Sequence, residues 1–568
     1  MNGAQAILKT LKEEKVKHSF GVTGGSVIPL FDEYYKDNHG IRHIMNRHEQ
    51  GAAHAAEGYA RACGKPGVCI ATSGPGATNL VTGIMDAYMD STPIIAFGGQ
   101  VPTSLIGNDA FQESDMIGIT MPITKHNFQI RSPDKIRSTI KKAFMLATTG
   151  RPGPIYIDLP KDAQVKEVKN EDKNFTIEGY KPKTTGHPMQ IKKAAEMILN
   201  AERPLILVGG GVILANAAQE VTEFAKTFNI PVITTLMGKS AFPETNPLSL
   251  GMIGMHGKKV ANYAIVNADV VLNIGCRFSD RITGDLQTFL ENSKLIHIDV
   301  DSAEIGKNVK ADVPIVGDAK IIMVDILKVS KKVARNKKTA WAEKMKALAK
   351  DCDCTINIDS TPIDPRRLIH EINKAMSAND IITTGVGQHQ MFAAHFLKRT
   401  KPRTFITSGG AGTMGYGFPA SIGAKIAKPD VNVINIDGDG SFNMVIQELG
   451  TCKEENIKVT PIVFNNSYLG MVRQWLELFY DKRYSAVNLG GTVKFAKVAE
   501  AYGLSGIEVS KPSEIAPAIN EALKNDETTV IDVHIASESN IIPMFAAGAS
   551  VSEMFGPCIS EKYFRGSL

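Results

Sequence analysis

Several features that would assign this chain to a membrane, secreted or nucleic-acid-binding class are missing. No apolar stretch reaches the roughly 18 residues that a membrane span needs, and residues 1–20 lack the apolar core and cleavage site of a signal peptide. The seven cysteines include no CxxC pair. The 64 basic and 59 acidic residues give a net charge of +5 without a long basic run. We therefore expect a cytoplasmic protein with reduced thiols that acts on small molecules and binds neither nucleic acid nor membrane.

The chain is also too long for one hydrophobic core, since its 568 residues suggest about three or four domains. Short β-branched runs alternate with helical patterns, which is typical of βαβ units. We predict an α/β fold of three consecutive parallel-sheet domains, 1–165, 188–340 and 363–538, followed by a C-terminal tail, 539–568, that packs as a flap. The first and third look alike in plan. Segments 166–187 and 341–362 are predicted linkers, and the CxC of Cys352 and Cys354 belongs to the second of them.

Glu49 stands in the segment NRHEQGAAHAAEGYA (46–60), which has helical spacing. Ala52, Ala53, Ala56 and Ala60 follow it at i+3, i+4, i+7 and i+11, so the acid shares its face with small apolar residues. A solvated or capping glutamate is the common explanation. A buried carboxyl without a partner, however, costs on the order of several kcal/mol. The pattern therefore predicts a partner for Glu49 that its own helix does not supply.

The third unit contains two polar strand ends. One strand ends at Gly438-Asp439-Gly440, and 24 residues separate it from Asn465-Asn466 at the end of the next. Parallel strands bring these ends to one sheet edge, where ligands bind in such folds. Carboxylate and amide oxygens suit Mg²⁺, and the glycines allow close approach. A lone GDG would be explained by a plain turn, but GDG and NN at paired strand ends predict a cation that holds a phosphorylated ligand.

These two features resemble the motifs of thiamine diphosphate (ThDP) enzymes. In that family a glutamate, matched by Glu49, hydrogen-bonds N1′ of the aminopyrimidine and promotes loss of the thiazolium proton. The resemblance implies that Asp439, Asn466 and the main-chain oxygen of Tyr468 hold Mg²⁺, and that the loop GVGQH (385–389) helps to cradle the diphosphate. It also implies a pyrimidine-binding first domain and a diphosphate-binding third domain. ThDP would lie between two chains of a homodimer or homotetramer, with Glu49 buried only in the dimer.

The resemblance places a defined set of residues against ThDP. They are Glu49, Pro75, Asn79, Gln112, Val386, Gly387, Gln388, His389, Gly412, Met414, Gly438, Asp439, Gly440, Ser441, Asn466, Leu469, Gly470 and Met471.

Four further segments resemble one branch of these enzymes, the acetohydroxyacid (acetolactate) synthases. They are SGGAGTMGYGFPASIGA (408–424), GNDAFQE (107–113), GCRFSDRITG (275–284) and LGMVRQWLELFY (469–480). The resemblance implies decarboxylation of pyruvate and transfer of the two-carbon unit to pyruvate or 2-ketobutyrate, which serves branched-chain amino acid synthesis. The implied catalytic residues, besides Glu49, are Gly25, Gln112 and Lys161 lining the site, Met414 bending the cofactor, and Arg281 and Trp475 recognising the second keto acid.

The central unit resembles the part of these synthases that carries a structural, non-redox FAD. Its LVGGG turn alone is a weak dinucleotide signal that a tight βα turn explains equally well. Asp299 at a strand end is the type of residue that binds a ribose hydroxyl. The residues implied for FAD are Arg151, Gly209, Gly210, Gly211, Thr235, Leu236, Met237, Met255, His256, Gly275, Arg277, Asp280, Arg281, Asp299, Val300 and Asp318.

Other functions stay open on the sequence alone. A ThDP- and FAD-dependent pyruvate oxidase would use the flavin as an electron acceptor, and a catabolic acetolactate synthase would need no flavin. Glyoxylate carboligase is disfavoured because it lacks the activating glutamate. A non-catalytic binding subunit is disfavoured by the intact Glu49, Asp439 and Asn466. The small regulatory subunit of such synthases is a further partner that the sequence leaves open.

Overall fold

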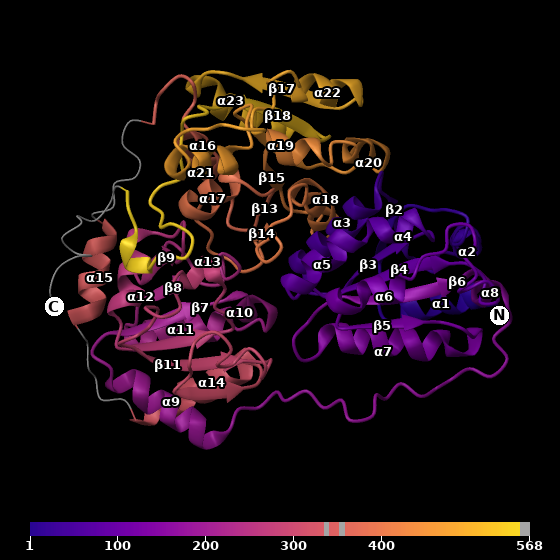
Figure 1. Cartoon of the computed structure of the whole chain (residues 1–568), viewed down its shortest axis with the longest axis horizontal. Coiled ribbons are helices and arrows are strands. Elements are labelled where there is room, and N and C mark those ends of the chain that lie inside the picture. Colours follow the sequence, from indigo (N-terminus) through magenta and orange to yellow (C-terminus); the bar gives the residue numbers. More distant parts are fainter. Residues whose placement is uncertain (334–339, 351–357, 557–568) are drawn as a thin grey trace.

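Three six-stranded sheets, each with all its strands parallel, organise the chain in the computed structural model (Figure 1). The structure describes residues 1–333, 340–350 and 358–556. The predicted α/β fold of three parallel-sheet units is confirmed. Cys352 and Cys354, together with the final residues of the predicted tail, lie outside the described residues.

The first sheet has the strand order β2-β1-β3-β4-β6-β5. Its strands β3, β4 and β6 are buried along their whole length, as expected for a parallel sheet covered by helices on both faces. The elements are α1 (Gly3–Glu13), β1 (His18–Gly21), α2 (Ile28–Lys36), β2 (Arg42–Met45), α3 (Glu49–Cys63), β3 (Gly67–Ala71), α4 (Pro75–Asn79), α5 (Val81–Met89), β4 (Ile94–Gln100), α6 (Met116–Thr120), η1 (Met121–Ile123), β5 (His126–Gln129), η2 (Pro133–Lys135), α7 (Ile136–Thr148), β6 (Ile155–Pro160) and α8 (Lys161–Val165).

The central sheet runs β12-β11-β10-β7-β8-β9, which is the order of a doubly wound dinucleotide-binding fold. Its strand order reverses between β7 and β10, so a crevice is expected at their carboxyl ends. The elements are α9 (Pro188–Asn200), β7 (Pro204–Val208), α10 (Gly210–Leu214), α11 (Ala218–Phe228), β8 (Val232–Thr234), β9 (Ser249–Met252), α12 (Lys259–Asn267), β10 (Val270–Ile274), α13 (Asp280–Thr283), β11 (Lys294–Asp299), β12 (Val313–Val316), α14 (Ala319–Val333) and α15 (Ala340–Lys350).

The third sheet, β14-β13-β15-β16-β18-β17, repeats the order of the first when strands are counted within each domain. This agrees with the expectation that the two units share a plan. The elements are α16 (Pro365–Ala375), β13 (Ile381–Thr384), α17 (Gln388–Phe396), β14 (Phe405–Thr407), α18 (Gly417–Ala427), β15 (Val433–Gly438), α19 (Asp439–Asn443), α20 (Glu448–Glu454), β16 (Thr460–Asn465), α21 (Gly470–Phe479), α22 (Phe495–Ala501), β17 (Ser505–Val509), α23 (Pro512–Lys524), β18 (Thr529–His534) and η3 (Val551–Glu553).

The connecting segments differ in character. Residues 166–187 contain no helix or strand and run as an extended stretch from the first domain to the central one (Figure 1). In contrast, α15 occupies the start of the predicted second linker, and its Trp341, Met345 and Leu348 pack into the core of the central domain. The sequence shows the helical spacing of these apolar residues, but the many charged residues around them made the segment look like a linker. The tail also lies against the central domain, since the Phe545 amide donates to the Met255 carbonyl.

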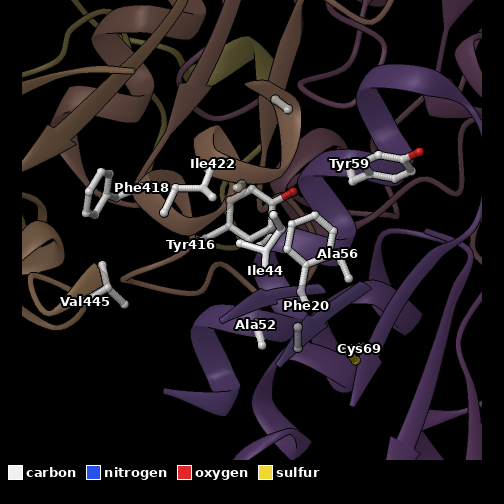
Figure 2. Close-up of a cluster of buried hydrophobic side chains, with 14 of the residues drawn as sticks. Phe20, Ile44, Ala52, Ala56, Tyr59, Cys69, Tyr416, Phe418, Ile422 and Val445 are labelled. Carbon is white, nitrogen blue, oxygen red and sulfur yellow. The ribbon is translucent and has the colours of Figure 1, made fainter. Parts of the chain in front are cut away.

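Helices α3 and α18 join the first domain to the third within one chain. A Cβ added to Gly58 would stand 2.0 Å from the Ala420 carbonyl oxygen, and one added to Gly423 would stand 1.8 Å from that of Ala55. The two backbones therefore touch at positions where only glycine fits. Figure 2 shows the apolar side chains of both domains meeting around this contact, with Tyr416 facing the first domain.

Within the described residues, no helix combines the length and the apolar character that crossing a membrane requires.

Substitution Gly423→Ala should weaken this docking. The added methyl group would overlap the Ala55 carbonyl oxygen, and overpacking of this kind costs about 1–3 kcal/mol. We expect a lower unfolding temperature by calorimetry. Ser421→Ala is the matched control, because it shortens a buried side chain on the same helix whose hydroxyl donates to the Phe418 carbonyl. An unchanged unfolding temperature for Gly423→Ala would contradict the contact.

Candidate active site

The predicted cation residues lie together at the carboxyl edge of the third sheet. Strands β15 and β16 are neighbours in register, with Gly438 opposite Phe464, so Asp439 and Asn466 follow adjacent strand ends. They line a cavity of about 80 Å³ together with Tyr468. The other predicted ThDP residues around this cavity are Val386, Gly387, Gln388, His389, Met414, Gly438, Gly440, Ser441, Leu469, Gly470 and Met471. The backbone at Gly470 approaches the side chain of Gln388 closely, because an added Cβ would stand 2.2 Å from its Oε1.

The environment of the Asp439 carboxyl suits a cation ligand. It is 5% exposed, and burial raises its pKa to about 7. The Gly440 amide donates to it at 3.1 Å, and no lysine or arginine of the described chain pairs with it. On the neighbouring strand end, the Asn466 side-chain oxygen accepts the Tyr468 amide at 3.0 Å. A carboxylate, an amide oxygen and a carbonyl are hard oxygen ligands, so the residues present fit Mg²⁺.

His389 is neutral in this setting. It is buried, and burial lowers its pKa to about 3. Its Nε2 lies 3.6 Å from the Asp437 carboxyl without a hydrogen bond. Cβ atoms added to Gly387 and Gly438 would approach the ring within 3.0 and 2.6 Å, so glycines enclose it. The imidazole therefore shapes the cavity wall without carrying charge.

Glu49 is the first residue of α3, at the carboxyl edge of the first sheet. It is 9% exposed, and its Oε2 accepts a hydrogen bond from the Asn79 amide at 3.0 Å. A Cβ at Gly76 would stand 3.2 Å from its other oxygen. The expectation that Glu49 is buried only in a dimer is therefore wrong, because α4 already covers the carboxyl within one chain.

The remaining predicted residues of the first domain border the same edge. Pro75 begins α4, and Gln112 contacts the turn before it, since a Cβ on Gly74 would stand 2.9 Å from the Gln112 Cβ. Among the described residues outside its own chain neighbours, no atom lies within 4 Å of a Cβ built on Gly25, so they leave the space in front of it open. Lys161 is half-buried at the end of β6.

The two halves of the predicted ThDP site do not meet within one described chain. The cavity beside Asp439 is lined from residue 386 to residue 535 and includes no residue of the first domain. Glu49, Asn79 and Gln112 line neither this cavity nor the larger one described next. Within the described residues, the two half-sites therefore line neither of these cavities in common.

A cavity of about 800 Å³ lies where the three domains meet. Every residue predicted for FAD lines it except Gly209, whose added Cβ would stand 2.1 Å from the Gly275 carbonyl oxygen. Gly412, Met414, Arg281 and Trp475 also line it. Val386, Gly387, Met414 and Met471 line both cavities, so the two are neighbours.

The large cavity has groups that suit a dinucleotide. Asp299 ends β11 at the cavity wall, and burial raises its pKa to about 6. Arg151 reaches in from the first domain and is held by Glu304 at 2.9 Å. The volume is within the range of cofactor pockets, and the site lies at the reversal point of the central sheet. Arg281 has a side chain 63% exposed and pairs with Asp280 at 3.5 Å, so it is free to turn toward an anionic ligand.

Two acids that the sequence reasoning missed hold the loop that carries Gly412 and Met414. Asp90, at the end of α5, accepts the backbone amides of Gly409 and Gly410 at 2.9 and 2.7 Å. Asp86 accepts the Ser408 hydroxyl at 2.5 Å and the Thr413 hydroxyl at 3.2 Å. The sequence did contain one sign of them, because two acids spaced i, i+4 on an apolar helix indicate buried carboxyls that need partners. Their partners, more than 300 residues away, were not visible in it.

Comparison with known proteins gives matches along nearly the whole chain. Three family models match, described as thiamine pyrophosphate enzyme N-terminal TPP binding domain (residues 1–119), central domain (191–326) and C-terminal TPP binding domain (385–533). A probable acetolactate synthase large subunit of Methanocaldococcus jannaschii is 51% identical over 98% of this chain and 95% of its own length. The acetolactate synthase of Arthrospira platensis is 45% identical over 98% of both chains.

The acetolactate synthase large subunit of Corynebacterium glutamicum is 45% identical over 98% of this chain and 90% of its own length. The chain therefore belongs to the acetolactate synthase family of thiamine diphosphate-dependent enzymes.

Proposed function

We propose that the protein decarboxylates pyruvate and joins the two-carbon unit to a second 2-keto acid with the help of ThDP and Mg²⁺. The products would be 2-acetolactate from pyruvate and 2-aceto-2-hydroxybutyrate from 2-ketobutyrate, as branched-chain amino acid synthesis requires. The observation that carries the proposal is the retention of both half-sites, Glu49 with Asn79 and Asp439 with Asn466, in a chain of this family. A non-catalytic binding subunit would not need a buried carboxyl at each half-site.

Each half-site has its own task in this proposal. Asp439, Asn466 and the Tyr468 carbonyl would hold Mg²⁺, which offsets the charge of Asp439 and of the diphosphate. When bound, ThDP would supply a thiazolium carbon acid whose conjugate base is the nucleophile that the keto group of pyruvate requires. Glu49 would exchange a proton with N1′ of its pyrimidine, and Asn79 orients the Glu49 carboxyl for this contact.

The same residues support a homodimer, or a tetramer built from such dimers. Glu49 and Asp439 lie at separate half-sites, so a complete centre requires the first domain of one chain and the third domain of another. Apolar side chains are exposed beside both. Phe111, next to Gln112, is 87% exposed, and Val472, which lines the small cavity, is exposed on α21, as is Phe479 at the end of that helix. A second copy that covers these side chains would bury apolar surface while completing the site.

Two further parts of the proposal concern the flavin and the acceptor. The large cavity would hold FAD as a structural group, with Asp299 at the ribose and Arg151 at the phosphates. Arg281 and Trp475 would face the second keto acid from the wall of the same cavity, where a guanidinium can bind a carboxylate through two hydrogen bonds. Because the named relatives include large subunits, a small regulatory subunit is proposed as an additional partner.

Replacing the Glu49 carboxyl by an amide tests the reaction. Glu49→Gln should lower acetolactate formation by about 10²–10⁴-fold, because a positioned proton-transfer group contributes that much. The assay supplies pyruvate, ThDP, Mg²⁺ and FAD and separates acetolactate from acetaldehyde, acetate and acetyl phosphate. Glu33→Gln is the matched control, since Glu33 is a 7% exposed acid of the same domain. A wild-type rate in Glu49→Gln would refute the assignment.

Mixing two inactive variants tests the shared site. Glu49→Gln and Asp439→Asn chains would each be inactive alone. If centres form between chains, random pairing gives mixed dimers with one intact centre, so about a quarter of wild-type activity should return after co-expression. Activity that stays at the level of the parent variants would show that each chain builds its own centre.

Anaerobic mixing with pyruvate tests the role of the flavin. For a structural FAD, the absorbance of the bound flavin should stay constant while acetolactate accumulates. Stoichiometric bleaching at the turnover rate would instead support a pyruvate oxidase. Full activity in protein freed of flavin would support the flavin-independent catabolic synthase.

A further inference from the structure

A carboxylate of the third domain is buried against the start of the helix that carries Glu49. Glu448, the first residue of α20, is fully buried. Its Oε1 accepts the backbone amides of Arg47 and His48, both at 3.1 Å. Its Oε2 accepts the Asn46 side-chain amide at 2.9 Å and the Thr451 hydroxyl at 2.7 Å. Three of these four donors belong to the first domain, directly before α3.

The contact meets a physical need of α3. The first backbone amides of a helix have no partner within it and carry the positive end of the helix dipole, so an anion at this place is stabilising. The His48 side chain accepts the Gln50 amide, and the Glu448 carboxylate accepts the amides of Arg47 and His48, which directly precede α3. A Cβ on Gly51 would stand 2.4 Å from Oε1 of Glu448, so the close approach depends on that glycine.

We propose that Glu448 is a positioning residue for the reaction, which holds the first turn of α3 so that the Glu49 carboxyl stays at its working place. The inference rests on the proposed role of Glu49 toward ThDP. Glu49 follows His48 directly, so any movement of the amides held by Glu448 moves its backbone as well. A displacement of about 1 Å in such a group can cost about a hundredfold in rate.

The position of Glu448 has a consequence for the dimer. The third domain of a chain would supply Asp439 to one centre and, through Glu448, would orient Glu49 of its own chain in the other. Interdomain contacts within each chain therefore link the geometry of the two centres. A carboxylate that only stabilised the fold would not affect the proton transfer at Glu49.

The test compares Glu448→Ala, Glu448→Gln and Gly51→Ala in the full-length protein. The first deletes the acceptor, and the second keeps one oxygen for the two amides. The third adds a methyl group against Oε1 of Glu448 while it raises the helix propensity of α3. Glu455→Ala is the control, because Glu455 also accepts a first-domain amide, from Met45, but does not touch α3.

Two readouts separate positioning from folding. Amide hydrogen exchange of residues 46–53, measured by mass spectrometry without cofactor, reports how firmly the start of α3 is held. Exchange of the thiazolium C2 hydrogen of bound ThDP with solvent deuterium, measured by NMR after quenching, reports the function of Glu49. Thermal unfolding of each variant verifies that it is folded.

For Glu448→Ala and Gly51→Ala we expect faster amide exchange and a C2 exchange about tenfold to a hundredfold slower. In Glu448→Gln and Glu455→Ala both exchange rates should stay within about threefold of the wild-type rates. Glu448→Gln keeps an acceptor for the two amides, and Glu455 accepts an amide outside α3. Slow C2 exchange in Glu49→Gln together with wild-type exchange in folded Glu448→Ala and Gly51→Ala would overturn this inference alone. Wild-type exchange in Glu49→Gln as well would overturn the proposed role of Glu49 and the inference with it.

Discussion

The contact between α3 and α18 is the constraint on which the site depends. Gly58 lies against the Ala420 backbone and Gly423 against the Ala55 backbone, so the first and third domains meet without intervening side chains. Across the same domain contact, Asp86 of α5 accepts hydrogen bonds from the loop that precedes α18. Across it, α20 also lies beside the start of α3. The fold thus joins the first and third domains through direct backbone contact between two helices.

Buried carboxyls are distributed around that contact in a consistent way. Asp86 and Asp90 hold the loop before Met414, and Glu448 holds the residues before Glu49. Each of these three acids accepts hydrogen bonds from the other of the two domains in the same chain, as buried polar groups require. Asp439 differs in its donor, because the Gly440 amide that it accepts belongs to its own domain. The three acids at the contact accept donors across it, although Oδ2 of Asp86 has no hydrogen-bond partner among the described residues.

Much of this arrangement could be predicted from the sequence because the signals are local. Strand ends at Asp439 and Asn466 follow from β-branched runs and glycines, and the register of β15 with β16 then brings them together. Fifteen residues predicted for FAD line one cavity even though Arg151 belongs to another domain. The helix α15 was missed because its apolar residues are sparse among charges, and Gly209 proved to serve backbone packing.

The cover of Glu49 by α4 within one chain and the partners of Asp86 and Glu448 could not be predicted, because they depend on contacts between residues far apart in the chain. The central claim is that each chain carries two half-sites of different centres. A crystal structure of the protein with ThDP and Mg²⁺ tests it most directly. We predict a diphosphate bound through Mg²⁺ to Asp439 and Asn466 of one chain, and a pyrimidine N1′ within hydrogen-bonding distance of Glu49 from the other. A cofactor that contacts Glu49 and Asp439 of the same chain would contradict the account.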